Sequence, residues 1–185
     1  MKRRLILVSS CAALLSGCTS APVYSWQIAA ETGPVRGGTG IRVGVRSIGL
    51  PSALNQSGVP KPGIAYAANT FTNDSWAAPL SAMLQTTLVR NLTQRLPRDT
   101  ILSDGGAIGA APDKIVEVQV LTFAPDASGT ITLTAQLACR PTTSQNWQLQ
   151  NFNASTAGGK TAETITAAMS KLWGQMSDQL ATMLS

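Results

Sequence analysis

The chain has 185 residues, of which only 12% are charged, and it contains no histidine and three cysteines. This length suits one domain of ordinary size. The lack of histidine excludes histidine-based catalytic triads, histidine general bases and the common histidine-containing zinc sites. A tetrathiolate metal site is excluded as well, because the chain has only three cysteines and one of them, Cys11, lies in the N-terminal leader described below.

The N-terminus predicts a secretory signal peptide, because Lys2, Arg3 and Arg4 precede the largely apolar run 5–15. That run is too short for a membrane-spanning helix, which needs about 20 apolar residues. Without the leader, the 14 basic residues fall to 11 against 9 acidic ones, so the net charge falls from +5 to +2. A charge this small predicts no nucleic-acid partner.

The leader ends in Leu15-Ser16-Gly17-Cys18, which resembles the bacterial lipobox. Leu15, Ser16 and Gly17 would be recognised by lipoprotein signal peptidase, since small residues let an extended backbone enter its cleft. The Cys18 thiol would then accept diacylglycerol. We expect this covalent lipid on Cys18 and no cofactor. The alternative is an ordinary cleaved signal in which Cys18 is incidental.

Lipidation would place the protein on a membrane surface, because two or more acyl chains hold a protein stably on a bilayer. Thr19, where an aspartate would retain the protein at the inner membrane, implies the periplasmic face of the outer membrane. We therefore expect a signal peptide over 1–17, a lipidated tether over 18–22 and one domain over 23–185. Cys139 is then the one unmodified cysteine, and we expect it as a buried, inert thiol on a strand.

Hydrophobic periodicity predicts an α/β domain. Ile41, Val43 and Val45 alternate with Arg42 and Arg46, so the arginines mark a solvated strand face or, alternatively, a subunit contact. Strands are predicted over 23–28, 41–48, 64–71, 100–103, 114–123, 130–138 and 147–154, with a turn-rich loop between 51 and 63.

Two long helices are predicted. The first has N-cap residues in Asn73-Asp74-Ser75, Pro79 in its opening turn and Pro97 at its end. Its apolar stripe is Leu80, Leu84, Leu88, Leu92 and Leu96, with Met83 beside it. The second begins near Thr161 and runs to the C-terminus. Its stripe, which we expect in the core rather than on a membrane, is Ile165, Met169, Leu172, Trp173, Met176, Leu180 and Met183.

No catalytic machinery is recognisable. Gly158-Gly159-Lys160-Thr161 ends like a phosphate-binding loop, but Ala154 stands where its first glycine belongs. Gly38-Thr39-Gly40 fails as a dinucleotide motif because Val43 replaces the third glycine. The nine scattered carboxylates offer no obvious acid–base pair. We therefore predict a protein that is not an enzyme and that holds neither metal nor nucleotide.

Several segments together resemble the PqiC-like family of ABC-type transport auxiliary lipoproteins. They are Tyr24-Ser25-Trp26, the Ile-Gly-Leu-Pro run within 45–54, Trp76-Ala77-Ala78-Pro79-Leu80, the Leu-x-x-Asn-Leu of 88–92, and Lys171-Leu172-Trp173. The segment 58–63, rich in proline and glycine, departs from the family pattern.

The resemblance implies a single three-layer α/β domain with a mixed sheet and two long helices, anticodon-binding-like and similar to the N-terminal domain of TolB. It also implies a non-enzymatic part in an MCE-type system for intermembrane phospholipid transport. The protein would dock the tunnel of an MCE-domain protein, with its inner-membrane partners, at the outer membrane and support envelope integrity, and we expect a homo-oligomer. The alternative is a structural or assembly lipoprotein of the outer membrane without a transport role.

Three residues of the matching segments are candidates for contact with a partner. Trp76 and Pro79, at the start of the first helix, would either bind a partner or fill the space between helix and sheet. Tyr24, close to the proposed anchor, would face either the membrane interface or a partner.

Overall fold

The computed structural model of the chain describes residues 21–63 and 69–185. In order along the chain its elements are β1 (Tyr24–Trp26), β2 (Arg42–Val45), the 3-10 turn η1 (Ser52–Leu54), β3 (Gly58–Pro60), β4 (Thr70–Trp76), α1 (Leu80–Arg95), β5 (Thr100–Ser103), β6 (Lys114–Pro125), β7 (Thr130–Pro141), β8 (Gln148–Ala157) and α2 (Ala162–Leu184). The predicted α/β class with two long helices is confirmed.

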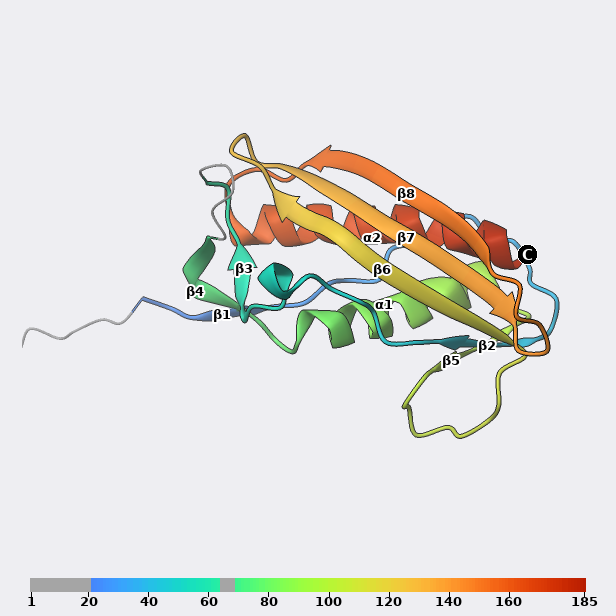
Figure 1. Cartoon of the computed structure of the whole chain (residues 1–185). Helices are drawn as coiled ribbons and strands as arrows, with labels where there is room; N and C mark the ends of the chain where they lie inside the picture. The colour runs from blue at the N-terminus through green and yellow to red at the C-terminus, as the bar shows by residue number, and fades with distance from the viewer. Residues whose placement is uncertain (1–20, 64–68) are drawn as a thin grey trace, which may run out of the picture.

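The described strands form two mixed sheets (Figure 1). The larger has the order β5-β2-β6-β7-β8, with β2 parallel to both of its neighbours and β6, β7 and β8 antiparallel. The smaller has the order β1-β4-β3 and lies at the end of the molecule where the described chain begins.

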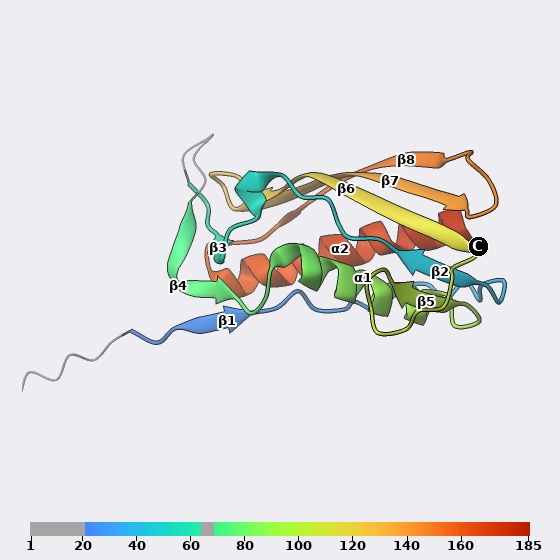
Figure 2. The ribbon, with the colours of Figure 1, turned by 60° about the horizontal axis from the view of Figure 1, so that its bottom comes forward.

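Both helices cover one face of the larger sheet, and the N-terminal segment lies on the far side of the helices (Figure 2). Sheet, helix pair and N-terminal segment are therefore successive layers. Along β7 the inward side chains Ile131, Leu133 and Leu137 are fully buried. Their outward neighbours alternate with them and are mainly threonine and glutamine, so this face of the sheet is polar.

The leucine stripe of α1 is buried as predicted, since Leu84, Leu88, Leu92 and Leu96 have no exposed surface. The predicted stripe of α2 is buried too, and its Trp173 ring stacks on Phe123 with the centroids 6.0 Å apart. The indole Nε1 of Trp173 donates to the carbonyl of Leu84 at 3.1 Å, which joins the two helices in the core.

The start of α1 differs from the prediction. Asn73-Asp74-Ser75 lies within β4, and α1 begins only at Leu80, with Pro79 in the N-cap position and no side-chain cap. The polar residues have strand partners instead: β4 pairs with β1 in parallel register, and Asp74 accepts a hydrogen bond from Nε1 of Trp26 at 2.7 Å. The carbonyl of Pro79 starts the helix by accepting from the amides of Ala82 and Met83.

Other element ends also shift. The first predicted strand, 23–28, shortens to Tyr24–Trp26, and the second, 41–48, shortens to Arg42–Val45. The strand predicted over 64–71 lies partly outside the described residues, and β4 begins at Thr70. β3 falls in the segment predicted as a loop, and it adds an antiparallel neighbour to β4. Cys139 is buried on β7, in agreement with its prediction.

Buried polar groups fix the N-terminal segment onto the helix pair. Arg95 at the end of α1 is fully buried, and its Nε donates to Oδ1 of Asp178 on α2 at 2.5 Å. Its other nitrogens donate to the carbonyls of Glu31, Asn91 and Gly174. The Asn91 side chain accepts from the Glu31 amide at 2.9 Å. A β-carbon on Gly174 would meet Glu31 at 2.7 Å, so a glycine in mid-helix lets this segment approach.

Candidate functional site

The residues predicted to carry the lipid anchor, Leu15, Ser16, Gly17 and Cys18, lie outside the described residues. Their roles stay predictions. Within 21–63 and 69–185 the structure contains no helix that is long and apolar enough to cross a membrane.

Of the predicted contact residues, two lie in the small sheet. Trp76, at the end of β4, pairs in register with Trp26 of β1 and is 7% exposed, so nearly all of its ring packs in the core. Tyr24 is 55% exposed, and its ring centroid lies 6.2 Å from that of Trp26. Pro79 is exposed at the beginning of α1.

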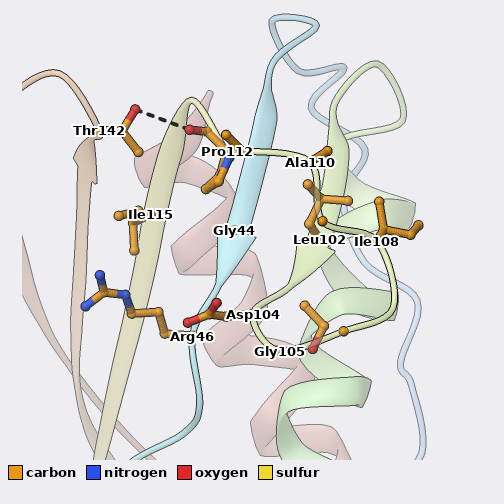
Figure 3. Close-up of a pocket in the computed structure, with 14 residues that line it drawn as sticks. Gly44, Arg46, Leu102, Asp104, Gly105, Ile108, Ala110, Pro112, Ile115 and Thr142 are labelled. Atoms are coloured by element: carbon orange, nitrogen blue, oxygen red, sulfur yellow. Dashed lines mark hydrogen bonds between the residues drawn. The ribbon is translucent and has the colours of Figure 1, made fainter.

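The largest change from the sequence prediction is a pocket of about 500 Å³ that lies on the sheet face opposite the helices. Its floor comes from neighbouring strands: Gly44 of β2 and Ile115 of β6 are partners in the parallel register, and Leu102 comes from β5. One wall is the loop 104–113, which carries Ile108 with 68% of its surface exposed (Figure 3). β2 and β5, which line this pocket, lie at the end of the molecule opposite the small sheet (Figures 1 and 2).

Hydrogen bonds hold the loop at both of its ends. At its start, the amide of Asp104 donates to the carbonyl of Val45 at 2.8 Å. At its end, Thr142 Oγ1 donates to the carbonyl of Pro112 at 3.2 Å (Figure 3). A β-carbon at position 44 would lie 2.9 Å from the ring of Pro112, so Gly44 allows the loop to close over β2. The strands and this loop therefore form a pocket whose wall is held in place by hydrogen bonds.

Charged side chains lie around this pocket in pairs. Arg42 Nη2 is 2.8 Å from Asp113 Oδ1, and Arg46 Nη1 is 2.5 Å from Glu117 Oε1. Hydrogen bonds from the Arg42 side chain lower the pKa of Asp113 to about 2. All four side chains are 39–47% exposed in the single chain, which agrees with both predicted alternatives, a solvated face and a subunit contact.

The lining of the pocket is largely apolar. Leu102, Ile108, Pro112 and Ile115 give it an apolar lining, and its volume is in the usual range for ligand sites, about 300–1,000 Å³. Arg46, its cationic group, is held by Glu117. Among the residues that the structure describes, no group of three or more acidic or cysteine side chains could hold a metal ion. An apolar side chain or an acyl chain is the ligand chemistry that fits.

Sequence analysis did not find this pocket. Its loop, rich in glycine, alanine and proline, carries no periodic pattern, and Ile108 is a single apolar residue within it. The nearest signal was Gly44, a glycine between Val43 and Val45 in a predicted strand, because a glycine inside a strand often marks a close approach of backbone or ligand.

The fold has solved relatives. A protein from Xanthomonas campestris is 14% identical, has a TM-score of 0.71, and the match covers 89% of this chain and 95% of that one. An uncharacterized protein of known crystal structure is 18% identical, with a TM-score of 0.70 over 85% of this chain and 99% of that one. No curated protein matches the chain. These two solved proteins therefore share the α/β fold of this chain.

The family follows from the sequence. Residues 24–181 match the family described as ABC-type transport auxiliary lipoprotein component, and the chain belongs to it. This agrees with the resemblance to PqiC-like proteins. The family is one of transport components attached to membranes as lipoproteins and is not a class of enzymes.

Proposed function

We propose that the protein is an outer-membrane lipoprotein that docks the far end of an MCE-type lipid-transport assembly. The observation that carries this proposal is the family match over 24–181, which makes the chain an auxiliary component of a transport system. An auxiliary component without a nucleotide motif contributes by binding its partners. The cargo that we propose is phospholipid, and the role in the cell is to support envelope integrity.

The anchor in this proposal is a lipid on Cys18. The first strand of the domain begins at Tyr24, six positions after Cys18, so the domain would follow its anchor after a very short tether. The strands that line the pocket, β2 and β5, lie at the end opposite β1 (Figure 1). An anchored domain with its long axis away from the membrane would therefore present the pocket to the periplasm.

Ile108 is the residue that we propose for contact with the MCE-domain protein. It is 68% exposed beside an apolar pocket, and an exposed apolar side chain next to a concave apolar surface is typical of a binding site. For contact between copies we propose the polar outer face of the larger sheet and its edge strand β8. Leu149 on β8 is 70% exposed and would lie in that contact. A ring of copies would match the symmetry of a hollow partner.

The experiment is affinity capture of the full chain from detergent-solubilised envelopes of a strain that encodes an MCE-domain protein. Wild-type protein should recover the MCE-domain protein and its inner-membrane partners, and its native mass should exceed the 19.3 kDa of one chain several-fold. Ile108→Ser should recover much less. Val35→Ser, at a position with 69% exposure in another loop, is the matched control and should behave as wild type.

A strictly monomeric protein that captures no MCE-domain protein would contradict the proposal and favour the structural or assembly lipoprotein. The anchor is tested separately with labelled fatty acid, which wild-type protein should incorporate and Cys18→Ala should not. Deletion of the gene should sensitise cells to detergents.

A further inference from the structure

The small sheet borders a second, more open groove of about 720 Å³ at the opposite end from the pocket. It lies between β1, β4 and the beginning of α2. The residues that matter for its chemistry are Pro22, Tyr24, Trp26, Phe71, Lys160 and Glu163. Segments from the N-terminus, the middle and the C-terminal part of the chain therefore meet at this end of the folded domain.

The groove presents aromatic surface to solvent. Tyr24 is 55% exposed, and the neighbouring Val23 is 73% exposed. Trp26 satisfies its one polar atom internally, because Nε1 donates to Asp74 at 2.7 Å. Tyrosine and tryptophan rings with one apolar and one polar end are enriched where a membrane meets water. A lysine such as Lys160 can lie along apolar surface and place its ammonium among lipid headgroups.

Chain length decides which surface this groove meets. The three peptide steps from Cys18 to Ala21 span at most about 11 Å when fully extended. The headgroup layer on one side of a bilayer is about 5–8 Å thick, as the difference between total and hydrocarbon thickness indicates. Acyl chains on Cys18 would therefore hold the groove, which Ala21 borders, at or within reach of that layer.

We propose that this groove rests in the headgroup layer of the membrane and that Tyr24 and Lys160 are its lipid contacts. The proposal deepens the proposed function and rests on the lipidation of Cys18. Two attachments, acyl chains and an aromatic surface, fix the orientation of the domain, whereas one attachment at a single point would leave it free to turn. The orientation keeps the pocket around Ile108 away from the membrane.

The test uses the full, lipidated chain in vesicles of phosphatidylethanolamine and phosphatidylglycerol. An environment-sensitive fluorophore is attached at Glu163→Cys, which is exposed in the first turn of α2 and far from Cys18 in sequence. The control position is Ile108→Cys, which is 68% exposed at the opposite end. Cys139 is buried and is left in place. Phospholipids that carry a quencher near the headgroup should quench the probe at 163 several-fold more than the probe at 108.

A second variant tests the contact itself. Tyr24→Ser in the Glu163→Cys background should lower the quenching several-fold, whereas Val35→Ser should leave it unchanged. Equal quenching at 163 and 108 in protein that floats with the vesicles would overturn the inference and leave the lipid anchor standing. Protein that neither floats nor carries a fatty acid would overturn the anchor as well. Tyr24→Ser that keeps its quenching but loses capture of the MCE-domain protein would identify the groove as a protein contact and overturn the membrane contact.

Discussion

Removing the carboxylate of Asp178 should destabilise the domain much more than an ordinary surface substitution. The Asp178 side chain is 31% exposed, but its partner Arg95 is fully buried. In Asp178→Ala the guanidinium stays buried with only the carbonyls of Glu31, Asn91 and Gly174 as acceptors. Breaking a buried ion pair by removing one partner costs about 3–5 kcal/mol.

The expected loss lies at the lower end of that range, about 3 kcal/mol, because water reaches one side of the pair and three acceptors remain. For a domain of this size, 1 kcal/mol lowers Tm by about 2–4 °C, so Tm should fall by about 6–12 °C. Urea and thermal unfolding of the protein beginning at Thr19 measure both values. Asp178→Asn, which keeps an acceptor for Nε of Arg95 but loses the charge, should cost less.

The double variant Arg95→Met/Asp178→Ala separates the buried charge from the lost contact. A buried ion pair can often be replaced by apolar residues of similar volume at little cost. The double variant should therefore be more stable than Asp178→Ala alone. Ordinary surface substitutions change the free energy of unfolding by no more than about 0.5 kcal/mol. If Asp178→Ala changes it no more than that, the ion pair does not hold the N-terminal segment and the reasoning is wrong.

Leu88 is fully buried, so Leu88→Ala should lower the free energy of unfolding by about 2–5 kcal/mol in urea, whereas a loss below 1 kcal/mol would contradict a packed stripe. Hydrogen bonds from Arg42 hold the pKa of Asp113 at about 2, below its unfolded value of about 3.9. The stabilisation that Asp113 gives the folded state is therefore complete above the unfolded pKa and is lost as pH falls toward 2. The stability difference between wild type and Asp113→Asn should shrink over that window; a constant difference would argue against the pairing. Burial raises the pKa of the Cys139 thiol, so a thiolate-selective reagent should label native protein much more slowly than protein in urea at the same pH, and equal rates would show an accessible thiol.

Both helices could be predicted because their apolar spacing reports directly which face is buried. Leu84 and Leu88 on α1 and Met169 and Trp173 on α2 have no exposed surface in the structure. The strands of the larger sheet were also predictable, since β-branched runs bounded by turn residues are local features. Their order, with β2 between β5 and β6, is a tertiary property that no local pattern contains.

The small sheet could not be predicted for the same reason. Asp74 has good N-cap chemistry as an isolated residue, and nothing near it in sequence shows that Trp26, 48 positions earlier, is its partner. Arg95 and Asp178 are 83 positions apart. In the sequence, Arg95 near the end of α1 and Asp178 on the polar face of α2 both resemble solvent-exposed charges, because only the fold brings them together. Asn91, in the Leu-x-x-Asn-Leu segment, likewise finds its partners in Glu31 and Ser177.

The N-terminal segment has a consequence for the order of events during export. The amide of Ala29 donates to Oγ of Ser170, 141 positions later, and Glu31 is held through Arg95, itself bound to Asp178 of α2. These contacts can form only once α2 is present to pack against. We therefore expect the segment around Ala29 and Glu31 to stay unpacked until α2 has been made and delivered across the membrane. In the proposed lipidation, the enzymes that cut before Cys18 and acylate it would then meet a peptide that is not yet packed, and the domain would close over this segment only when α2 arrives.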